Sequence, residues 1–332
     1  MEKKIGGVLN VKMTEQLRET IRIISRKHLE ENNGLLLGQC LTAVGWVGNT
    51  IPEMPENKGL VELSMDDTFA GYFISGIAAG DKVRPIYVVR YQGFQWFNAV
   101  GIVNYAAKSK EMWKIPCPVF VRSIAMEGGG RKGRDERAIG PVASASHHGI
   151  FYRMPGIPIC APATPKEYES IWNHFMNHDD PLYVSEHRRV WDVDYEMQDT
   201  LEKDADITLF PISATRLNAR EAVGRLEKEA GIKCNVVNLL WLKPLDLNKK
   251  DEKIEYSLNN SRCGGLVLDG DYINGVAKNI AYELMHKYEK KIYALGLEER
   301  ASGFAPWNNN LAPTPDRIYS YVRWLVGKNK KT

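Results

Sequence analysis

The first regular pattern in the chain is a series of apolar residues near the N-terminus. Leu17, Ile21, Ile24 and Leu29 recur at roughly helical intervals, after Thr14 as a candidate N-cap and before the sequence Asn-Asn-Gly. Such spacing lines up apolar side chains on one face of a helix. We therefore predict an amphipathic helix over residues 14–31.

Short apolar runs and longer helical patterns then alternate as far as residue 187. The intervening residues 42–58 are rich in Gly, Pro and Asn and predict a long loop. The expected strands are 34–40, 85–91, 117–126, 157–163 and 181–187, and the expected helices are 68–80, 97–113 and 165–178. Alternation of this kind favours a parallel sheet, so the fold class is α/β with a doubly wound parallel sheet.

A second alternating series follows a polar stretch that has no clear period and that we interpret as a linker. Its expected strands are 206–212, 234–242, 264–271 and 291–297, and its expected helices lie at 218–231, near residue 250 and at 276–288. We therefore predict a first domain over residues 1–190, a linker over 191–203 and a smaller second α/β domain over 204–328.

Composition narrows the class of protein. With 332 residues, 44% of them apolar, the chain is long enough to bury two cores. Its 44 basic and 41 acidic residues are spread along the whole chain, so no basic block indicates a nucleic acid partner. Five separated cysteines without a Cys-x-x-Cys pair indicate buried free thiols in a reducing compartment. Because the N-terminus lacks a signal-like apolar run and no run is long enough to span a bilayer, we expect a cytoplasmic protein.

A glycine-rich segment at residues 128–133 matches the dinucleotide pattern Gly-x-Gly-x-x-Gly. The residues after it do not form the apolar helix that would bind a pyrophosphate, and they also lack the Lys and Ser or Thr of a P-loop. We interpret the segment as a basic loop that faces substrate, since Arg clusters suit carboxylate or phosphate groups. A solvated charge run is the alternative. The basic residues are Arg131, Lys132, Arg134 and Arg137.

Two other polar segments could bind a metal ion. Asp269, Asp271 and Asn274 carry oxygen ligands of the kind magnesium prefers, but their place after an apolar strand favours a turn, and we predict no metal site on this chain. His147 and His148 are adjacent, so their side chains point in different directions and do not easily serve one metal. One of them could act as an acid or base in a cleft, and a surface pair is the alternative.

Glu186, His187 and Arg188 end the strand expected at 181–187. Ligand crevices of open parallel sheets lie beyond the carboxyl ends of the strands. The sequence therefore leaves two interpretations of this segment open, a ligand-binding turn and a solvated, salt-bridged turn.

Read in order, several segments resemble the beta subunits of 2-oxo acid dehydrogenases and, more distantly, the matching half of transketolases. These segments are residues 68–80, 84–108, 118–128, 154–168, 179–188, 207–212, 241–246 and 275–277. The resemblance implies a pyrimidine-binding domain followed by a transketolase-type C-terminal domain. It also implies that thiamine diphosphate is shared with an alpha-type partner in an α2β2 heterotetramer. The partner would hold the diphosphate and its Mg2+, because the Gly-Asp-Gly motif with paired Asn residues is missing here.

The resemblance further implies a carboxylate that hydrogen-bonds the aminopyrimidine ring of the cofactor. In the family this is a Glu just before the Phe-x-Gly helix, and the ungapped match puts Asp66 at its position. Asp is one methylene shorter, so Asp66 would need a shifted backbone or a bridging water, and Asp67 and Glu62 are the substitutes. The alternative is that the aspartates cap the following helix.

The same match places Phe94 where the family stacks an aromatic ring on the aminopyrimidine, with Tyr91 and Arg90 on the same loop. An aromatic side chain in a crevice stacks well on a flat heterocycle. The alternative is that Phe94 and Trp96 belong to the core. We predict that Asp66, Phe94, Arg90 and Tyr91 bind the cofactor.

A second departure from the family lies before residue 154. The dehydrogenases carry a His in a His-Ser pattern that is linked to acyl transfer to a lipoyl arm, whereas this chain has Ala143 followed by Ser144. The register of His147 and His148 differs by several residues. This departure argues against delivery to a lipoyl domain.

The resemblance implies a beta-type subunit of a heteromeric thiamine-diphosphate-dependent enzyme, active only with its partner. It would activate the cofactor for decarboxylation of a 2-oxo acid or for transfer of a ketol or acyl unit. One alternative is a two-chain transketolase-like enzyme that acts on sugars, and another is a degenerate, non-catalytic scaffold subunit. We expect Asp66 and His147 to be catalytic, and we expect substrate to contact Arg122, Arg131, Ser144 and His148.

Overall fold

The computed structural model describes most of the chain and divides it into two compact units. The first unit comprises Met1–Ala125 and Phe151–Met197, and the second comprises Met126–Ile150 and Gln198–Thr332. The described residues are 2–4, 10–12, 15–32, 34–42, 45–63, 69–81, 83–127, 145–245, 251–301, 307 and 310–329.

The first unit is built on a parallel sheet with the strand order β7-β8-β6-β5-β3-β4. Its strands are β3 (Leu36–Gln39), β4 (Leu60–Leu63), β5 (Ile86–Arg90), β6 (Phe120–Ala125), β7 (Ile159–Cys160) and β8 (Leu182–His187). Strands β3, β5, β6 and β8 are buried along nearly their whole length, as expected of parallel strands with helices on both faces. The predicted doubly wound α/β fold is confirmed.

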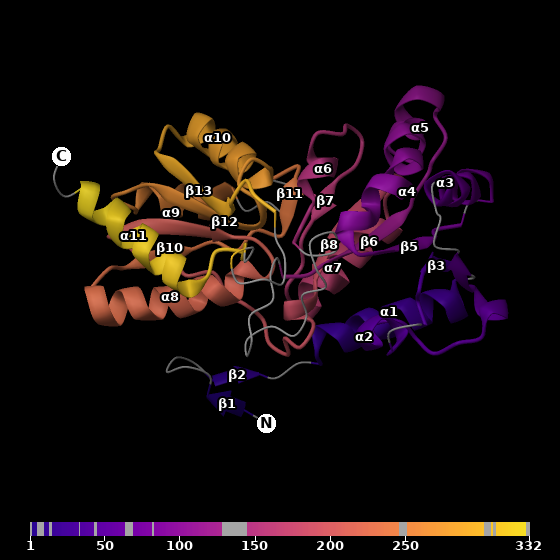
Figure 1. The fold of residues 1–332 in the computed structure, drawn as a ribbon, viewed down its shortest axis with the longest axis horizontal. Helices are drawn as coiled ribbons and strands as arrows, with labels where there is room; N and C mark the ends of the chain where they lie inside the picture. The colour runs from indigo at the N-terminus through magenta and orange to yellow at the C-terminus, as the bar shows by residue number, and fades with distance from the viewer. Residues whose placement is uncertain are drawn as a thin grey trace. The chain divides into compact units, whose positions relative to one another are not determined.

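Helices connect these strands in the indigo to magenta part of Figure 1. They are α1 (Leu17–Glu31), α2 (Gly45–Asn49), α3 (Ala70–Gly80), α4 (Gln95–Gly101), α5 (Ala107–Trp113), α6 (Gly149–Tyr152) and α7 (Pro165–Met176). Short turns complete the unit: η1 (Glu56–Lys58), η2 (Gln92–Phe94) and η4 (Arg188–Val190), with a small antiparallel ladder of β1 (Glu2–Lys4) and β2 (Asn10–Lys12).

The predicted N-terminal helix exists, but it begins at Leu17 with Gln16 at its N-cap position, and Thr14 lies outside the described residues. Leu17, Ile21 and Leu29 are buried, as the periodicity predicts. The helix α1 packs on α7, where the rings of His28 and Trp172 meet edge to face with 5.0 Å between their centroids.

The prediction of a single helix over residues 97–113 is wrong in one respect. The structure inserts a π-helical turn, η3 (Ile102–Ala106), between α4 and α5. A π turn widens the helix and rotates the residues after it, which the apolar pattern by itself does not reveal.

The second unit has a parallel sheet with the order β10-β9-β12-β13. Its strands are β9 (Ile207–Pro211), β10 (Cys234–Val236), β12 (Gly265–Tyr272) and β13 (Ile292–Leu297), and β11 (Trp241–Lys243) follows β10 in sequence. Its helices are α8 (Thr215–Ala230), α9 (Asp251–Asn259), α10 (Val276–Tyr288) and α11 (Pro315–Asn329). The continuous strand expected over 234–242 is therefore split into two.

The core of the second unit lies between its sheet and the pair of helices α8 and α11, which lie side by side in Figure 1. Leu209 and Leu266 from the sheet meet Leu226 of α8 and Ile318 and Val322 of α11. Each of these side chains is fully buried. An apolar stripe on each helix therefore closes the core, as the helical periodicity predicts.

A segment from the middle of the chain also belongs to the second unit. Met126 and Ala145 form an antiparallel bridge, in which the Ala145 N–H donates to the Met126 carbonyl over 2.8 Å. The Ser146 N–H donates to the Gly270 carbonyl of β12 over 3.3 Å. Residues 145–149 are thereby fixed at the carboxyl end of β12.

In the part of the chain that the structure describes, no helix combines the length and the apolar character needed to cross a membrane.

Close contact between α3 and α4 depends on two glycines. A Cβ atom at Gly101 would overlap backbone atoms of Gly71 and Tyr72. Rigid backbone cannot yield to an added methyl group as a flexible side chain can, and overpacking costs about 1–3 kcal/mol. We expect Gly101→Ala to lower the free energy of unfolding by about that amount, measured by urea denaturation.

Gly224 of α8 provides the matched control, because a Cβ atom there would meet no atom within 4 Å. Gly224→Ala should stabilise the chain by about 0.5–1 kcal/mol through helix propensity alone. Equal effects of the two substitutions would contradict the close helix contact at Gly101.

Candidate functional site

The carboxyl ends of β5, β6 and β8 lie at one edge of the first unit's sheet, because the three strands are parallel neighbours. Arg90 ends β5, Tyr91 follows it, and Phe94 closes the turn η2. Tyr91 is buried, whereas Arg90 and Phe94 are half-buried. These three residues therefore share the end of one strand, and their role in cofactor binding stays a prediction.

Cationic and aromatic side chains alternate at this edge. The Arg90 guanidinium donates to the Cys40 carbonyl over 2.6 Å and lies 5.4 Å from the Tyr91 ring centre. Arg188 donates to the Tyr91 hydroxyl over 3.1 Å and stacks on Trp191, with 5.4 Å from its guanidinium carbon to the ring centre. Such contacts hold the two cations in place beside aromatic rings.

For Arg188, the sequence leaves open whether the turn binds a ligand or is a solvated, salt-bridged turn. Its described contacts are aromatic, and it lies beside the Tyr91 of the candidate site. Its ligand role stays a prediction.

Arg122 lies on β6 and is fully buried. Its guanidinium donates twice to the Glu186 carboxylate on β8, over 2.8 and 2.9 Å, and once to the Thr50 hydroxyl over 2.9 Å. The Tyr168 hydroxyl also donates to Glu186, over 2.9 Å. Burial alone would lower the pKa of Arg122, but the Glu186 carboxylate raises it above its ordinary value. Arg122 thus holds a buried ion pair between two strands, and its contact with substrate stays a prediction.

Several predicted site residues lie outside the described residues. They are Asp66, Asp67, Arg131, Lys132, Arg134, Arg137, Ala143 and Ser144. Of the substitutes for Asp66, Glu62 is described: its carboxylate accepts from the Thr42 hydroxyl over 2.7 Å at the end of β4.

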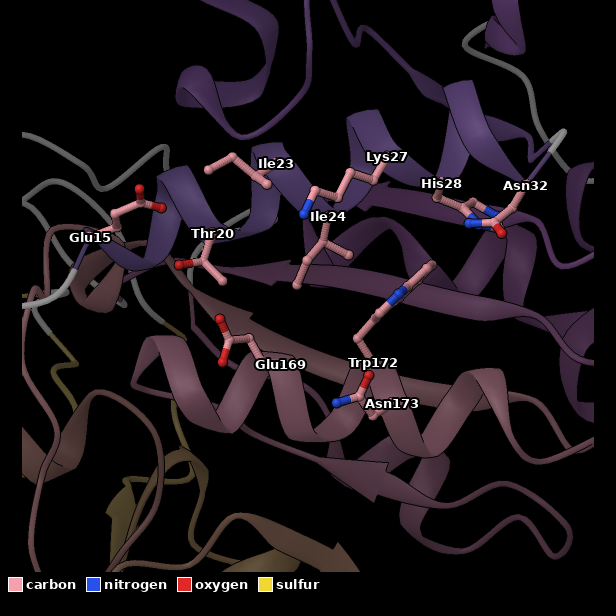
Figure 2. A pocket seen from close by; sticks show the side chains of 10 residues that line it. All are labelled: Glu15, Thr20, Ile23, Ile24, Lys27, His28, Asn32, Glu169, Trp172 and Asn173. Carbon is pink, nitrogen blue, oxygen red and sulfur yellow. The ribbon is translucent and has the colours of Figure 1, made fainter.

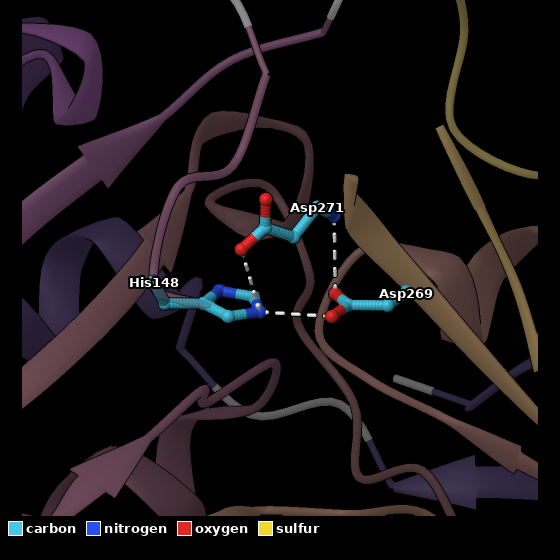
Figure 3. A group of neighbouring side chains, drawn as sticks. All are labelled: His148, Asp269 and Asp271. Atoms are coloured by element: carbon cyan, nitrogen blue, oxygen red, sulfur yellow. Dashed lines mark hydrogen bonds and ion pairs between the residues drawn. The ribbon is translucent and has the colours of Figure 1, made fainter. Parts of the chain in front are cut away.

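Figure 3 shows His148, Asp269 and Asp271 together in the second unit, all of them buried. The Nε2 atom of His148 lies 3.0 Å from Asp269 Oδ2 and 3.9 Å from Asp271 Oδ2. Asp271 also accepts from the backbone N–H groups of Gly149, over 2.7 Å, and of Tyr272, over 2.6 Å. His147 is half-buried, and its ring lies 5.9 Å from that of Tyr272.

The charges of this cluster are interdependent. Burial lowers the pKa of His148, but attraction and hydrogen bonding to Asp269 outweigh it and raise the pKa to about 9. Burial raises the pKa of Asp271 to about 6, against the opposing effect of His148. The cationic imidazolium is therefore the stable form of His148 near neutral pH.

The ligand-type atoms of His148, Asp269 and Asp271 lie within 4.8 Å of one another. That spacing suits a metal ion, yet the backbone N–H groups and the imidazolium already occupy these carboxylates. The Asn274 side chain donates to Glu299 over 2.8 Å. We therefore interpret the group as a buried ion-paired cluster.

A hollow of about 330 Å³ opens between α1 and α7 of the first unit, as Figure 2 shows. None of the residues predicted to bind cofactor or substrate lines it. Its walls are Glu15, Thr20, Ile23, Ile24, Lys27, His28, Asn32, Glu169, Trp172 and Asn173.

Sequence reasoning missed the glutamines on either side of Phe94. Gln92 and Gln95 are both fully buried. Glutamine is mostly exposed in proteins, so the sequence gives no sign that these two residues are buried. Their burial depends on the neighbouring strands.

The pairing of His148 with Asp269 predicts a pH-dependent stability. A His whose pKa is raised by folding contributes stability in full below its unfolded value, about 6.5, and loses it as the pH rises through the folded value. The folded value is about 9, so the free energy of unfolding should fall by up to about 3 kcal/mol between pH 6.5 and pH 9. Urea denaturation at each pH measures this.

Asp269→Asn removes the carboxylate and should flatten that pH dependence. Glu19→Gln, which disrupts an exposed pair with Arg22 on α1, serves as the control and should leave it unchanged. The same slope in Asp269→Asn and the wild type would show that the ion pair does not set the pKa of His148.

Comparison with known proteins gives a family match in the C-terminal part of the chain. Residues 198–318 match the family described as the transketolase C-terminal domain. The solved structure of a split gene transketolase, an inactive beta4 tetramer, has a TM-score of 0.67 at 14% identity and covers 95% of this chain and 99% of its own. At that identity the likeness concerns the fold.

Two relatives resemble the chain in sequence. The beta subunit of acetoin:2,6-dichlorophenolindophenol oxidoreductase from Cupriavidus necator is 25% identical over 205 residues, which cover 57% of this chain and 57% of that subunit. The beta subunit of the pyruvate dehydrogenase E1 component from Acholeplasma laidlawii is 22% identical over 289 residues, which cover 79% of this chain and 82% of that subunit. The chain is therefore similar to beta subunits of acetoin oxidoreductase and of the pyruvate dehydrogenase E1 component, and its residues 198–318 match the transketolase C-terminal domain family.

Proposed function

We propose that the chain is the beta-type subunit of a heteromeric enzyme that uses thiamine diphosphate. It would activate the cofactor for decarboxylation of a 2-oxo acid or for transfer of a ketol or acyl unit. The relatives named as beta subunits support this proposal. The observation that carries it is the half-buried Phe94 ring at the carboxyl edge of the first unit's parallel sheet. In this proposal residues 1–190 form the pyrimidine-binding domain and residues 204–328 the C-terminal domain.

The residues at this edge suit the aminopyrimidine part of the cofactor. The ring of Phe94 offers a stacking surface, and Arg90 and Tyr91 lie at the end of the strand that leads into its turn. When bound, thiamine diphosphate supplies the nucleophilic carbon of the reaction. This chain would orient the cofactor's pyrimidine ring with Phe94 and hydrogen-bond it with a carboxylate. Asp66 is the carboxylate that we propose, and it lies outside the described residues.

A partner chain is the second part of the proposal. The helix α3 carries no charged residue, yet it and the residue before it expose Phe69, Tyr72 and Phe73. Trp96 of the neighbouring α4 is exposed as well. A helix that is apolar all round is normally buried, and a contiguous exposed apolar patch marks an interaction site. We propose that this face binds the alpha-type chain that holds the diphosphate and Mg2+ in an α2β2 assembly.

A two-chain transketolase-like enzyme that acts on sugars is the second candidate. The fold match to a split gene transketolase favours it. Ala143 in place of the dehydrogenase His also suits it, since a transketolase has no lipoyl acceptor.

Loss of the Phe94 ring should weaken binding of the cofactor. Stacking of a heterocyclic base on an aromatic side chain is worth about 1–3 kcal/mol, so Phe94→Ala should raise the Kd of the two-chain complex for thiamine diphosphate by about 5- to 150-fold. Titration calorimetry on the assembled complex with Mg2+ measures the Kd. Trp324→Ala, an exposed aromatic change on α11, is the control and should leave it unchanged.

An unchanged cofactor affinity in the Phe94→Ala complex would contradict the stacking role. Asp66→Ala in the same complex distinguishes a catalytic subunit from a non-catalytic scaffold subunit. Turnover equal to that of the wild type would favour the scaffold.

A charge on the exposed face of α3 should weaken assembly. Phe73→Glu places a carboxylate on the proposed interface, and burial of an unpaired charge there should weaken association by on the order of 100-fold. Sedimentation of mixed chains measures the complex. Tyr282→Glu on α10 is the matched exposed aromatic control, and an intact complex with Phe73→Glu would refute this face as the docking surface.

A further inference from the structure

Two buried glutamines bracket the stacking candidate Phe94. Gln92 begins the turn η2 and Gln95 begins α4, so they lie two residues before and one residue after Phe94. Both are fully buried, whereas the ring between them is half-buried. Phe94 is therefore the partly exposed residue of a turn whose polar residues on either side are buried.

The amide of Gln92 bonds to two adjacent strands. Its Nε2 atom donates to the Ser123 carbonyl of β6 over 3.0 Å and to the Ser185 hydroxyl of β8 over 2.8 Å. Ser123 and Ser185 are register partners in the parallel ladder. A single side chain thus fixes the start of the turn to two strands at the same level.

The amide oxygen of Gln95 accepts from the same two strands. The Tyr183 hydroxyl of β8 donates to it over 2.6 Å, and the Ser123 hydroxyl of β6 donates over 3.2 Å. Tyr183 is itself held by Phe151, whose ring stacks on it at 4.3 Å. The start of α4 is thereby fixed to the sheet as firmly as the start of the turn.

Hydrogen bonds define an orientation, while apolar burial alone is non-directional. An apolar pair at these positions would bury the turn and leave it free to rotate by a small angle. Buried polar networks that are bonded on several sides specify one geometry, and rings that stack need a fixed plane. The two amides therefore suit the task of orienting what lies between them.

We propose that Gln92 and Gln95 are positioning residues that fix the plane of the Phe94 ring for the pyrimidine of the cofactor. The proposal rests on the proposed function of Phe94. The glutamines do not touch the cofactor in this proposal, and they act on it only through that ring.

The test uses the assembled two-chain complex with thiamine diphosphate and Mg2+. Gln92→Met and Gln95→Met keep the length of the side chain and remove its hydrogen bonds. Each should raise the Kd for the cofactor by about tenfold, because small displacements at a site have large effects on binding and rate. Calorimetric titration measures the Kd, and thermal unfolding measures stability in the same samples.

The decisive measurement is a double-mutant cycle with Phe94→Ala. If the glutamines act through the ring, Gln95→Met should change the Kd by less than about twofold once the ring is gone. A full tenfold effect in the Phe94→Ala background would overturn the proposal, since the glutamine would then act by another route.

Two further variants serve as controls for a general loss of structure. Asn235→Leu removes another fully buried amide, in the second unit, and should lower thermal stability without changing the Kd. Tyr183→Phe removes only the hydroxyl that donates to Gln95, and it should reproduce part of the Gln95→Met effect while the complex stays folded.

The outcomes separate this inference from the proposed function. If Phe94→Ala leaves the Kd unchanged, the stacking role itself is refuted. If Phe94→Ala weakens binding while Gln92→Met, Gln95→Met and Tyr183→Phe all bind like the wild type, only the positioning role is refuted.

Discussion

The parallel register of β5, β6 and β8 is the constraint on which the candidate site depends. Because the strands are in register, their carboxyl ends stop at one edge, and side chains from different strands meet there. Polar bonds across the ladder reinforce it. Arg122 is tied to Glu186, and Gln92 is tied to Ser123 and Ser185. Breaking such a bond would leave a buried polar group or charge unpaired, which makes the register costly to change.

In the second unit, polar bonds likewise attach a segment from the middle of the chain to the end of a strand. Residues 145–149 attach to the end of β12 through backbone bonds and through the ion pair between His148 and Asp269. Burial by itself would favour neutral histidine, and the carboxylates reverse that preference. The segment is thus held by charge as well as by shape, and its attachment depends on the protonation of His148.

The proposed function joins these features. The first unit offers a half-buried ring at a sheet edge and an uncharged helix with exposed aromatic residues, and both suit a subunit that shares a cofactor with a partner. The match to the transketolase C-terminal domain lies in the second unit, whereas the candidate cofactor site lies in the first unit. In the proposed function, substrate choice between 2-oxo acids and sugars would depend on the groups near the cofactor, and Arg90 and Arg188 at the sheet edge are candidates for that role.

The sequence by itself determined the alternation of strands and helices, the α/β class and the order of segments in which the family resemblance lies. These follow from local periodicity and from the order of segments, which are properties of residues near one another in the chain. Only the tertiary structure decided that Gln92 and Gln95 are buried, that a π turn interrupts the helix after Phe94, and that His148 meets Asp269, 121 residues away. The physical reason is that burial and charge pairing depend on which strands become neighbours, and no local pattern records that choice.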